Sequence, residues 1–151
     1  MLIQPDSPLA ADVAELLATH LAFARAASPP EDVHALDVDG LLDPRIALFS
    51  LREDGRLLAI GALKQLSDTE AEVKSMHTAS EARGRGLGRA MLQHLLAVAR
   101  QRGVRRVSLE TGSMAEFAPA RALYASAGFE PCEPFGDYLP SPSSAFMTLL
   151  L

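Results

Sequence analysis

Tryptophan is absent from this sequence of 151 residues, and aromatic residues as a whole make up only 5 % of it. Cysteine occurs once, at Cys132, which excludes an internal disulfide and a zinc site built from cysteines. The sequence has four histidines, and they are dispersed without clustered partner ligands, so we expect no bound metal. A single cysteine also fits a reducing compartment.

Positive charge is scarce as well. The sequence has 14 Lys and Arg residues against 19 Asp and Glu residues, which gives a formal net charge of -5. This balance argues against nucleic acid as the main partner, because no large basic face offsets it. The arginines concentrate between Arg83 and Arg106, which predicts one local basic patch.

Long apolar runs are also missing. No run approaches the roughly twenty residues that span a bilayer, and residues 1–6 lack the basic-then-apolar order of a signal peptide. We therefore expect a cytoplasmic protein without a membrane partner. Hydrophobic residues make up 48 % of the sequence and charged residues 22 %, as in ordinary soluble proteins. Without repeats or linkers, residues 1–151 are expected to form one domain.

Helix signals near the N-terminus predict two helices. The first is expected to begin at Ser7 and to place Leu9 and later apolar residues at helical spacing. The stretch Ser28-Pro29-Pro30-Glu31 has Ser as a cap, an early Pro and Glu three residues on. It predicts a second, short helix that carries Val33 and Leu36.

Strand signals occupy the middle of the sequence. A short first strand is expected at residues 2–3, and further strands at 46–51, 57–66 and 72–78. The pair Asp54-Gly55 supplies a hairpin turn between the first two long strands. In 72–78 the apolar positions Val73 and Met76 have opposite parity, so a regular strand would place them on different faces. We therefore expect a bulge that shifts the register there.

The second half reads as alternating helices and strands. The signals predict a helix over 87–102 closed by Gly103, a strand over 104–109, a helix over 116–127, a strand from 129, a loop over 131–144 and a strand over 145–151. A strand-helix-strand unit implies parallel pairing, whereas the early hairpin implies antiparallel pairing, so the sheet is expected to be mixed.

The most informative stretch is residues 83–88, Arg-Gly-Arg-Gly-Leu-Gly, between a strand and a helix. Such a loop gathers unpaired backbone N–H groups at the positive end of the helix dipole and is suited to phosphate. The nucleotide-triphosphatase string G-x-x-x-x-G-K-[ST] does not occur. Gly84 and Gly86 fit half of the dinucleotide fingerprint, but Arg89 replaces its third glycine, although Glu110 lies where a ribose-binding acid would.

Two motifs here resemble those of the GNAT superfamily of acetyl-CoA-dependent N-acetyltransferases. Arg83, Gly86 and Gly88 fit its [Q/R]-x-x-G-x-[G/A] motif, and residues 120–129 resemble its A-x-x-L-Y-x-x-x-G-F element. The resemblance implies an α/β (α+β) fold with a mixed central sheet, splayed middle strands and flanking helices. Phe117 departs from the pattern, because many members carry a cofactor-binding Asn there.

The resemblance also implies how acetyl-CoA, the acyl donor, would bind. Backbone N–H groups of the glycine loop would hold its pyrophosphate, and the pantetheine arm would pair with the edge of the preceding strand. The cofactor-binding residues would be Met76, His77, Thr78, Arg83, Gly84, Arg85, Gly86, Leu87, Gly88 and Arg89. Arg83 could equally form a surface ion pair.

Catalytic candidates follow from the chemistry of thioester aminolysis. An amine with a pKa near 10.4 must lose a proton before it attacks, and a carboxylate can accept it directly or through water. Glu72 and Glu110, both on strands beside the expected cleft, are the candidate bases. Tyr124 matches the family tyrosine that protonates the departing thiolate, although a core aromatic role is the alternative.

The acceptor is not identified by the sequence beyond an amine of a small molecule or a peptide. The N-terminal helices and the 131–144 loop, with Asp137 and Tyr138, should line its side of the cleft. The hydrophobic C-terminal strand is compatible with a homodimer. Two other functions stay open, namely a non-catalytic acyl-CoA sensor and a small nucleotide-binding redox protein.

Overall fold

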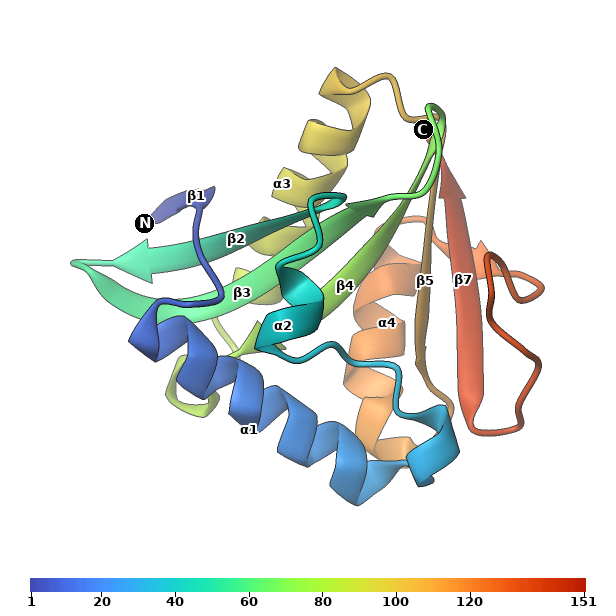
Figure 1. Cartoon of the computed structure of the whole chain (residues 1–151), viewed down its shortest axis with the longest axis horizontal. Helices are drawn as coiled ribbons and strands as arrows, with labels where there is room; N and C mark the ends of the chain where they lie inside the picture. The colour runs from blue at the N-terminus through green and yellow to red at the C-terminus, as the bar shows by residue number, and fades with distance from the viewer.

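A seven-stranded mixed sheet forms the centre of the protein, in the order β1-β2-β3-β4-β5-β7-β6 (Figure 1). The computed structural model describes residues 1–151. All neighbouring strands pair antiparallel except β4 and β5, which are parallel. The strands are β1 (Leu2–Pro5), β2 (Ile46–Glu53), β3 (Arg56–Gln65), β4 (Glu70–Thr78), β5 (Arg106–Gly112), β6 (Glu130–Pro131) and β7 (Ser144–Leu150).

Helices cover both faces of this sheet. The two N-terminal helices lie on one face and the two later ones on the other (Figure 1). The helices are α1 (Ala11–Ala27), α2 (Val38–Leu41), α3 (Leu87–Gln101) and α4 (Ala118–Ser126), with short 3-10 turns η1 (Pro30–Asp32), η2 (Ser80–Ala82) and η3 (Ala115–Phe117). No helix combines the length and the apolar composition that crossing a membrane requires. The expected α/β class with a mixed sheet is confirmed.

The β2–β3 hairpin divides its side chains between the two faces. Leu48 and Ile60 are buried in a small cluster with α1 and α2, whereas Phe49 and Leu63 are buried in the larger cluster with α3. This alternation follows from the period of two in a β-strand. The connecting turn has positive φ at Asp54 and Gly55, as a type I′ turn requires, so the predicted hairpin is confirmed.

A bulge interrupts β4 at Ser75. Its φ is 54°, and the register with β3 shifts between Ile60 and Ala62. Before the bulge Val73 is buried against α3, and after it Met76 packs against the same cluster. The extra residue therefore brings two side chains of opposite parity to one face, as the sequence predicts.

The two parallel strands separate after three residue pairs. Residues Glu70–Glu72 pair with Arg106–Ser108, and beyond them β4 and β5 have no common partners. Figure 1 shows the two strands close together at one end and apart at the other. The rest of β4 keeps β3 on one side and has an open edge on the other, which leaves backbone N–H and C=O groups free.

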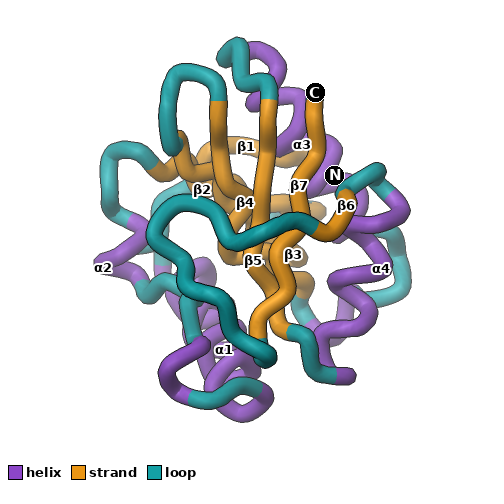
Figure 2. The backbone as a smooth tube through the Cα atoms, turned by 90° about the vertical axis from the view of Figure 1, so that its right-hand side faces the viewer, coloured by secondary structure: helices purple, strands orange, loops and turns teal.

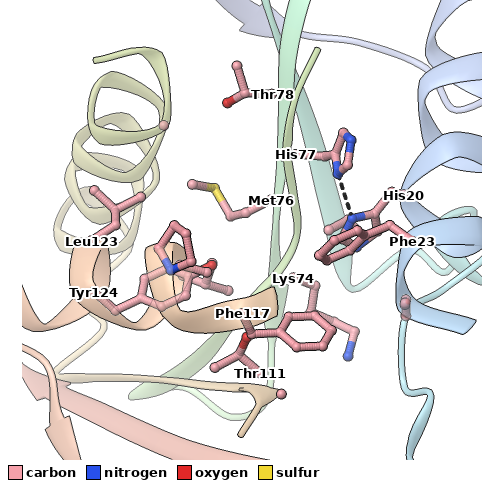
Figure 3. A pocket seen from close by; sticks show the side chains of 18 of the residues that line it. His20, Phe23, Lys74, Met76, His77, Thr78, Thr111, Phe117, Leu123 and Tyr124 are labelled. Carbon is pink, nitrogen blue, oxygen red and sulfur yellow. Dashed lines mark hydrogen bonds between the residues drawn. The ribbon is translucent and has the colours of Figure 1, made fainter. Parts of the chain in front are cut away.

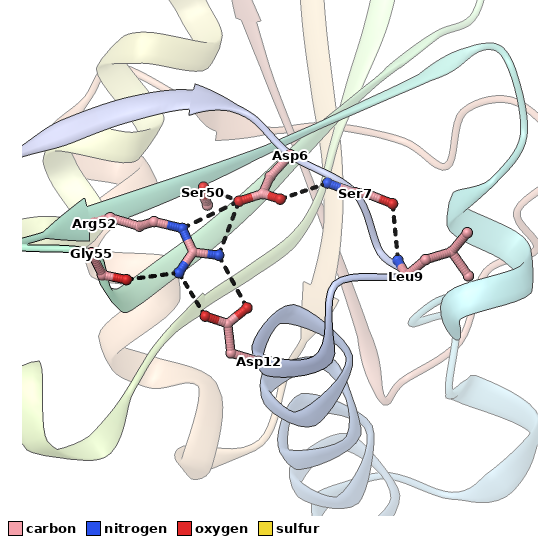
Figure 4. A network of polar contacts seen from close by, with 7 residues as sticks. All are labelled: Asp6, Ser7, Leu9, Asp12, Ser50, Arg52 and Gly55. Atoms are coloured by element: carbon pink, nitrogen blue, oxygen red, sulfur yellow. Dashed lines mark hydrogen bonds and ion pairs between the residues drawn. The ribbon is translucent and has the colours of Figure 1, made fainter.

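A partly exposed ion-pair network fixes the N-terminus to the hairpin (Figure 4). The Arg52 guanidinium donates to Asp6 of the β1–α1 connection and to Asp12 of α1, with N···O distances of 3.1 and 2.6 Å. The Ser50 hydroxyl also donates to Asp6, at 2.6 Å. Burial opposes ionisation of Asp6, but these hydrogen bonds prevail and lower its pKa. The network therefore fixes where α1 begins.

Two predictions about the N-terminal helices are wrong. Helix α1 begins at Ala11, so Leu9 precedes it and is exposed. Val33 and Leu36 lie in no helix, because the Ser-Pro-Pro-Glu start yields only the three-residue turn η1. Val33 has extended backbone geometry, and a new helix, α2, begins after Asp37, whose carboxylate caps it by accepting from the Gly40 N–H.

Smaller boundary differences occur near the C-terminus. The predicted helix over 116–127 divides into η3 and α4, and the strand expected from residue 129 is only two residues long. Figure 2 shows the long loop that leaves β6 and returns to the start of β7. Strand β7 pairs with β5 along its length and with β6 only at Met147 and Thr148. The homodimer through this strand stays a prediction.

Candidate active site

A cleft of about 720 Å³ occupies the space where β4 and β5 diverge. Its lining comes from both faces of the sheet, since α1 and the η1 segment lie on one side and α3 and α4 on the other (Figure 3). Every catalytic and cofactor-binding residue predicted from the sequence lines this cleft except Arg85. Asp137 does not line it, whereas Tyr138 does.

The glycine loop presents unpaired backbone N–H groups at one end of the cleft. None of the N–H groups of residues 84–89 donates a hydrogen bond within the protein, and no side chain caps α3. Gly84 and Gly86 both have φ of 78°, and a Cβ at either would meet no atom within 4 Å. Backbone conformation therefore explains these glycines, because positive φ orients successive N–H groups toward one point.

The three arginines of the loop have different surroundings. Arg85 donates to Glu53 of β2 at 2.6 Å and is exposed, so its side chain points away from the cleft. Arg89 donates to the Ser126 hydroxyl at 2.8 Å and so connects α3 with α4. Arg83 lines the cleft and forms no ion pair. The ion-pair role considered for Arg83 is therefore absent, and its charge remains available to a ligand.

Tyr124 lies on α4 and is 7 % exposed, with its ring near Phe129 at a centroid distance of 5.9 Å. Burial raises its pKa, so the phenol stays protonated at neutral pH and is available as a donor. Figure 3 places it beside Leu123 and across from Met76 of β4. The ring is therefore both a packed core aromatic and a wall of the cleft.

Glu72 belongs to a buried polar cluster. Its Oε2 accepts from Lys74 Nζ at 3.1 Å and from the Tyr138 hydroxyl at 2.5 Å. Lys74 Nζ also donates to the Tyr138 oxygen at 3.0 Å, which closes a three-membered ring of contacts. The side chains of Glu72 and Lys74 are only 5 % and 9 % exposed. An incoming amine would have to compete with two donors for this Glu72 oxygen.

Glu110 stands on β5 near the same cluster. Its pKa is raised from 4.5 to about 7, mainly by burial and in smaller part by the negative Glu72, against the lowering effects of Ser144 and the Lys74 charge. A carboxyl that titrates near neutral pH can both accept and release a proton at that pH. The two candidate bases therefore differ sharply in their surroundings.

His77 is hydrogen-bonded to His20 of α1, with 3.0 Å between the two Nδ1 atoms (Figure 3). One ring must donate and the other accept, so the accepting ring must be neutral. Burial, together with the smaller effect of the nearby His77, lowers the pKa of His20 to about 4. Burial, with Arg83 nearby, also lowers the pKa of His77. The pair holds α1 against the bulged part of β4.

Phe117 crosses the cleft toward α1. Its ring packs over Gly112 so closely that a Cβ there would come within 2.1 Å of it. On the other side it meets Phe23 of α1 edge to face, with a centroid distance of 5.2 Å. The Arg121 guanidinium donates to the Gly112 and Met114 carbonyls at 2.6 and 2.9 Å and so fixes the connection that carries Phe117.

The lining residues that the sequence analysis did not predict include Lys74, His20 and Phe23. Lys74 could have been predicted, because residues two apart on a strand share a face and Glu72 was already a candidate base. His20 and Phe23 are three residues apart on α1, which also puts them on one helix face. Nothing local indicated that this face meets the cleft.

Comparison with known proteins identifies the family. The model of the acetyltransferase (GNAT) family matches residues 12–129, which contain both the glycine loop and Tyr124. The chain therefore belongs to the GNAT family of acetyltransferases and is an acyltransferase.

Several relatives match the chain over nearly its full length. It is 45 % identical over 148 residues to the uncharacterized N-acetyltransferase YsnE of Bacillus subtilis, covering 98 % of each chain. It is 36 % identical to an IAA acetyltransferase of Azospirillum brasilense, covering 96 % of this chain and 94 % of the relative.

Solved structures share the fold. A Klebsiella pneumoniae protein assigned as an acyl-CoA N-acyltransferase has a TM-score of 0.82 at 28 % identity, covering 99 % of this chain and 97 % of that one. A GNAT family acetyltransferase from Elizabethkingia anophelis, solved with acetyl-CoA bound, has a TM-score of 0.73 at 15 % identity. It covers 99 % of this chain and 97 % of its own.

Proposed function

We propose that this protein transfers an acetyl group from acetyl-CoA to an amine of a small molecule or peptide, by direct attack of the amine on the thioester. The observation that carries the proposal is the position of the unpaired N–H groups of residues 84–89 at one end of a cleft that also contains Tyr124 and Glu110. The cleft therefore offers a diphosphate site, a proton donor and a proton acceptor together.

The donor side fits acetyl-CoA on geometry. The free N–H groups at the start of α3 suit a pyrophosphate, and Arg83 adds positive charge beside them. The open edge of β4 at Met76, His77 and Thr78 offers backbone partners for the amides of a pantetheine arm. Solved relatives of the same fold contain acetyl-CoA or coenzyme A, which supports this donor.

Glu110 is the better candidate base of the two carboxylates. Its pKa of about 7 suits proton transfer at neutral pH, whereas Glu72 Oε2 is already bonded to Lys74 and Tyr138. In the proposed reaction the amine loses a proton to Glu110, directly or through water. The amine nitrogen then forms a bond to the acetyl carbon and releases its surplus proton to solvent water, and the carbon–sulfur bond breaks to release the thiolate.

Tyr124 is the proposed proton donor to the departing thiolate. Its phenol retains its proton because burial raises its pKa. The phenol is the weaker acid of the two groups, so transfer to sulfur requires that a neighbouring group stabilise the phenolate at the same time. The Glu110 carboxyl, which gains a proton from the amine, can restore the phenol after release.

The names of the relatives do not identify the acceptor of this protein, because they refer to different molecules. One is an IAA acetyltransferase, and another acetylates an alanine of ribosomal protein bS18. The test is therefore a panel of small amines and peptides, in which free thiol released from acetyl-CoA is followed. We expect acceptor-dependent thiol release with at least one primary amine.

Substitution at Tyr124 separates catalysis from donor binding. In Tyr124→Phe we expect kcat to fall by about 100-fold while the Kd for acetyl-CoA from calorimetry stays unchanged. Cys132→Ser, which lies outside the cleft, is the control and should retain full turnover. Unchanged turnover in Tyr124→Phe would contradict the acid role.

Two further outcomes decide between the classes of function. Acetyl-CoA binding without thiol release for any amine would favour the non-catalytic sensor. Thermal stabilisation by NAD but not by acetyl-CoA would favour the redox protein.

A further inference from the structure

The few aromatic side chains of this protein gather at the cleft. Aromatic residues are only 5 % of the sequence, yet Phe23, Phe117, Tyr124 and Tyr138 all line it. Three of these four lie outside the glycine-loop end where the donor diphosphate would bind. Their positions therefore bear on the other substrate, the acceptor.

Phe23 and Phe117 form one wall of the acceptor half. They come from opposite faces of the sheet and meet through the gap between β4 and β5, with their planes inclined by 69°. Phe117 is immobilised by its packing on Gly112, whereas Phe23 is 36 % exposed. An exposed ring held against a fixed one presents an apolar edge onto which a flat group can pack.

Tyr138 and His34 form a second aromatic wall. Their rings meet edge to face at a centroid distance of 5.0 Å, and both line the cleft. The Tyr138 hydroxyl is bonded to Glu72, which fixes the ring orientation. The acceptor half therefore has two aromatic walls, which offer ring faces and edges to a flat apolar group.

The charges of this half are mostly negative. Glu72, Glu110 and Asp32 all line it, whereas Lys74 is the cation among them. The Lys74 ammonium is already paired with Glu72 at 3.1 Å, and Asp32 accepts only from the Ser141 hydroxyl, at 2.8 Å. Because Lys74 balances Glu72, the net negative charge of this half comes from Asp32 and from the ionised fraction of Glu110. This charge attracts a cationic amine and repels a carboxylate on the same molecule.

Building on the proposed function, we propose that the acceptor half of the cleft selects primary amines that carry a flat apolar group and no carboxylate. Phe23 and Phe117 are the residues that determine the preference for the flat group. The ammonium end lies toward Glu110, which is also the residue proposed to accept its proton. The aromatic body packs on the Phe23 edge, where it covers the exposed ring.

Three probe amines test both parts of this proposal. The values of kcat/KM for 2-phenylethylamine, n-butylamine and L-phenylalanine are compared by thiol release. We expect 2-phenylethylamine to exceed each of the others by about tenfold or more, since burying a phenyl ring or avoiding a carboxylate repulsion is worth roughly 1.4 kcal/mol or more. Equal values for 2-phenylethylamine and n-butylamine, or a preference for L-phenylalanine, would overturn it.

Substitutions of Phe23 and Phe117 test whether these two rings determine the preference for 2-phenylethylamine. Phe23→Leu and Phe117→Leu should each reduce the ratio of 2-phenylethylamine to n-butylamine by about threefold or more, with the Kd for acetyl-CoA unchanged. Phe49→Leu removes a buried ring outside the cleft and is the matched control, so its ratio should equal that of the wild type. A ratio that survives both cleft substitutions excludes these residues as determinants.

A binding measurement separates this inference from the proposed function. Calorimetry of the three amines against the protein saturated with coenzyme A needs no turnover. If none of them is acetylated but 2-phenylethylamine still binds most tightly, the proposed reaction fails with these amines and the aromatic subsite stands. If none binds, or n-butylamine binds equally well, the aromatic subsite is refuted whatever the activity.

Discussion

Replacing Glu110 with Gln tests whether this buried carboxyl titrates near neutral pH. Its pKa is raised from 4.5 to about 7, mainly by burial. Each pKa unit corresponds to about 1.4 kcal/mol, so the shift has an upper limit of about 3 kcal/mol. The residue keeps some solvent contact, which lowers the expected effect to about 1–2 kcal/mol.

The sign of the pH dependence follows from proton binding. Because the pKa of the folded protein is the higher one, the folded state holds more protons than the unfolded state between about pH 4.5 and pH 7. The free energy of unfolding therefore falls as the pH rises through this window and is constant above it. Glu110→Gln removes this slope and should be more stable than the wild type at about pH 8.

Two assays follow the same substitution. Urea unfolding across the pH range gives the free energy of unfolding of both proteins, with the exposed Glu130→Gln as control. Thiol release gives kcat/KM, which in the wild type should fall about tenfold per pH unit below pH 7 and in Glu110→Gln should be about 100-fold lower at its maximum. A flat wild-type profile, together with equal destabilisation of Glu110→Gln at every pH, would refute the reasoning.

Three further predictions concern residues around the cleft. The pKa of His20 is lowered to about 4, so the free energy of unfolding should decrease as the pH falls from about 6.5 to 4, by at most about 3 kcal/mol. In His20→Leu, the melting temperature should not show this decrease at acid pH. Gly86→Ala should weaken acetyl-CoA binding in calorimetry, because a φ of 78° strains a residue with a side chain by about 1–2 kcal/mol and the loop would shift. The control is Gly55→Ala, which has the same φ in the hairpin turn. It should lower the free energy of unfolding by a similar amount and leave acetyl-CoA binding unchanged. Gly61→Ala should destabilise the fold by about 1–3 kcal/mol in urea unfolding, because its Cβ would lie 2.6 Å from Met91 Cγ; a loss under 0.5 kcal/mol would mean that Met91 repacks freely.

Local rules predicted the elements whose causes are local. Asp54-Gly55 specifies the turn by its own backbone preference, and the parity of Val73 and Met76 specifies the bulge at Ser75. The glycine loop was predictable for the same reason, since positive φ at Gly84 requires no tertiary contact. Each of these inferences needed only neighbours within a few residues.

Predictions were wrong or missing where contacts between distant segments determine the local structure. Leu9 has helical spacing with later residues, yet the network around Arg52 fixes the chain so that α1 starts at Ala11. The contact between Lys74 and Tyr138 joins residues 64 positions apart, and no pattern near either one indicates it. The sequence alone indicates two distant residues as neighbours only when each of them belongs to a recognised motif.

The choice between Glu72 and Glu110 shows why a site needs its tertiary surroundings. Both are strand carboxylates beside the same gap, so their sequence contexts give them equal standing. The loop that carries Tyr138 covers Glu72 and, with Lys74, saturates one of its oxygens. Glu110 is not bonded to Lys74 or Tyr138, and burial outweighs the lowering effect of Ser144 and raises its pKa to about 7. The difference in hydrogen-bond partners therefore originates in part in the β6–β7 loop, because that loop carries Tyr138 to Glu72.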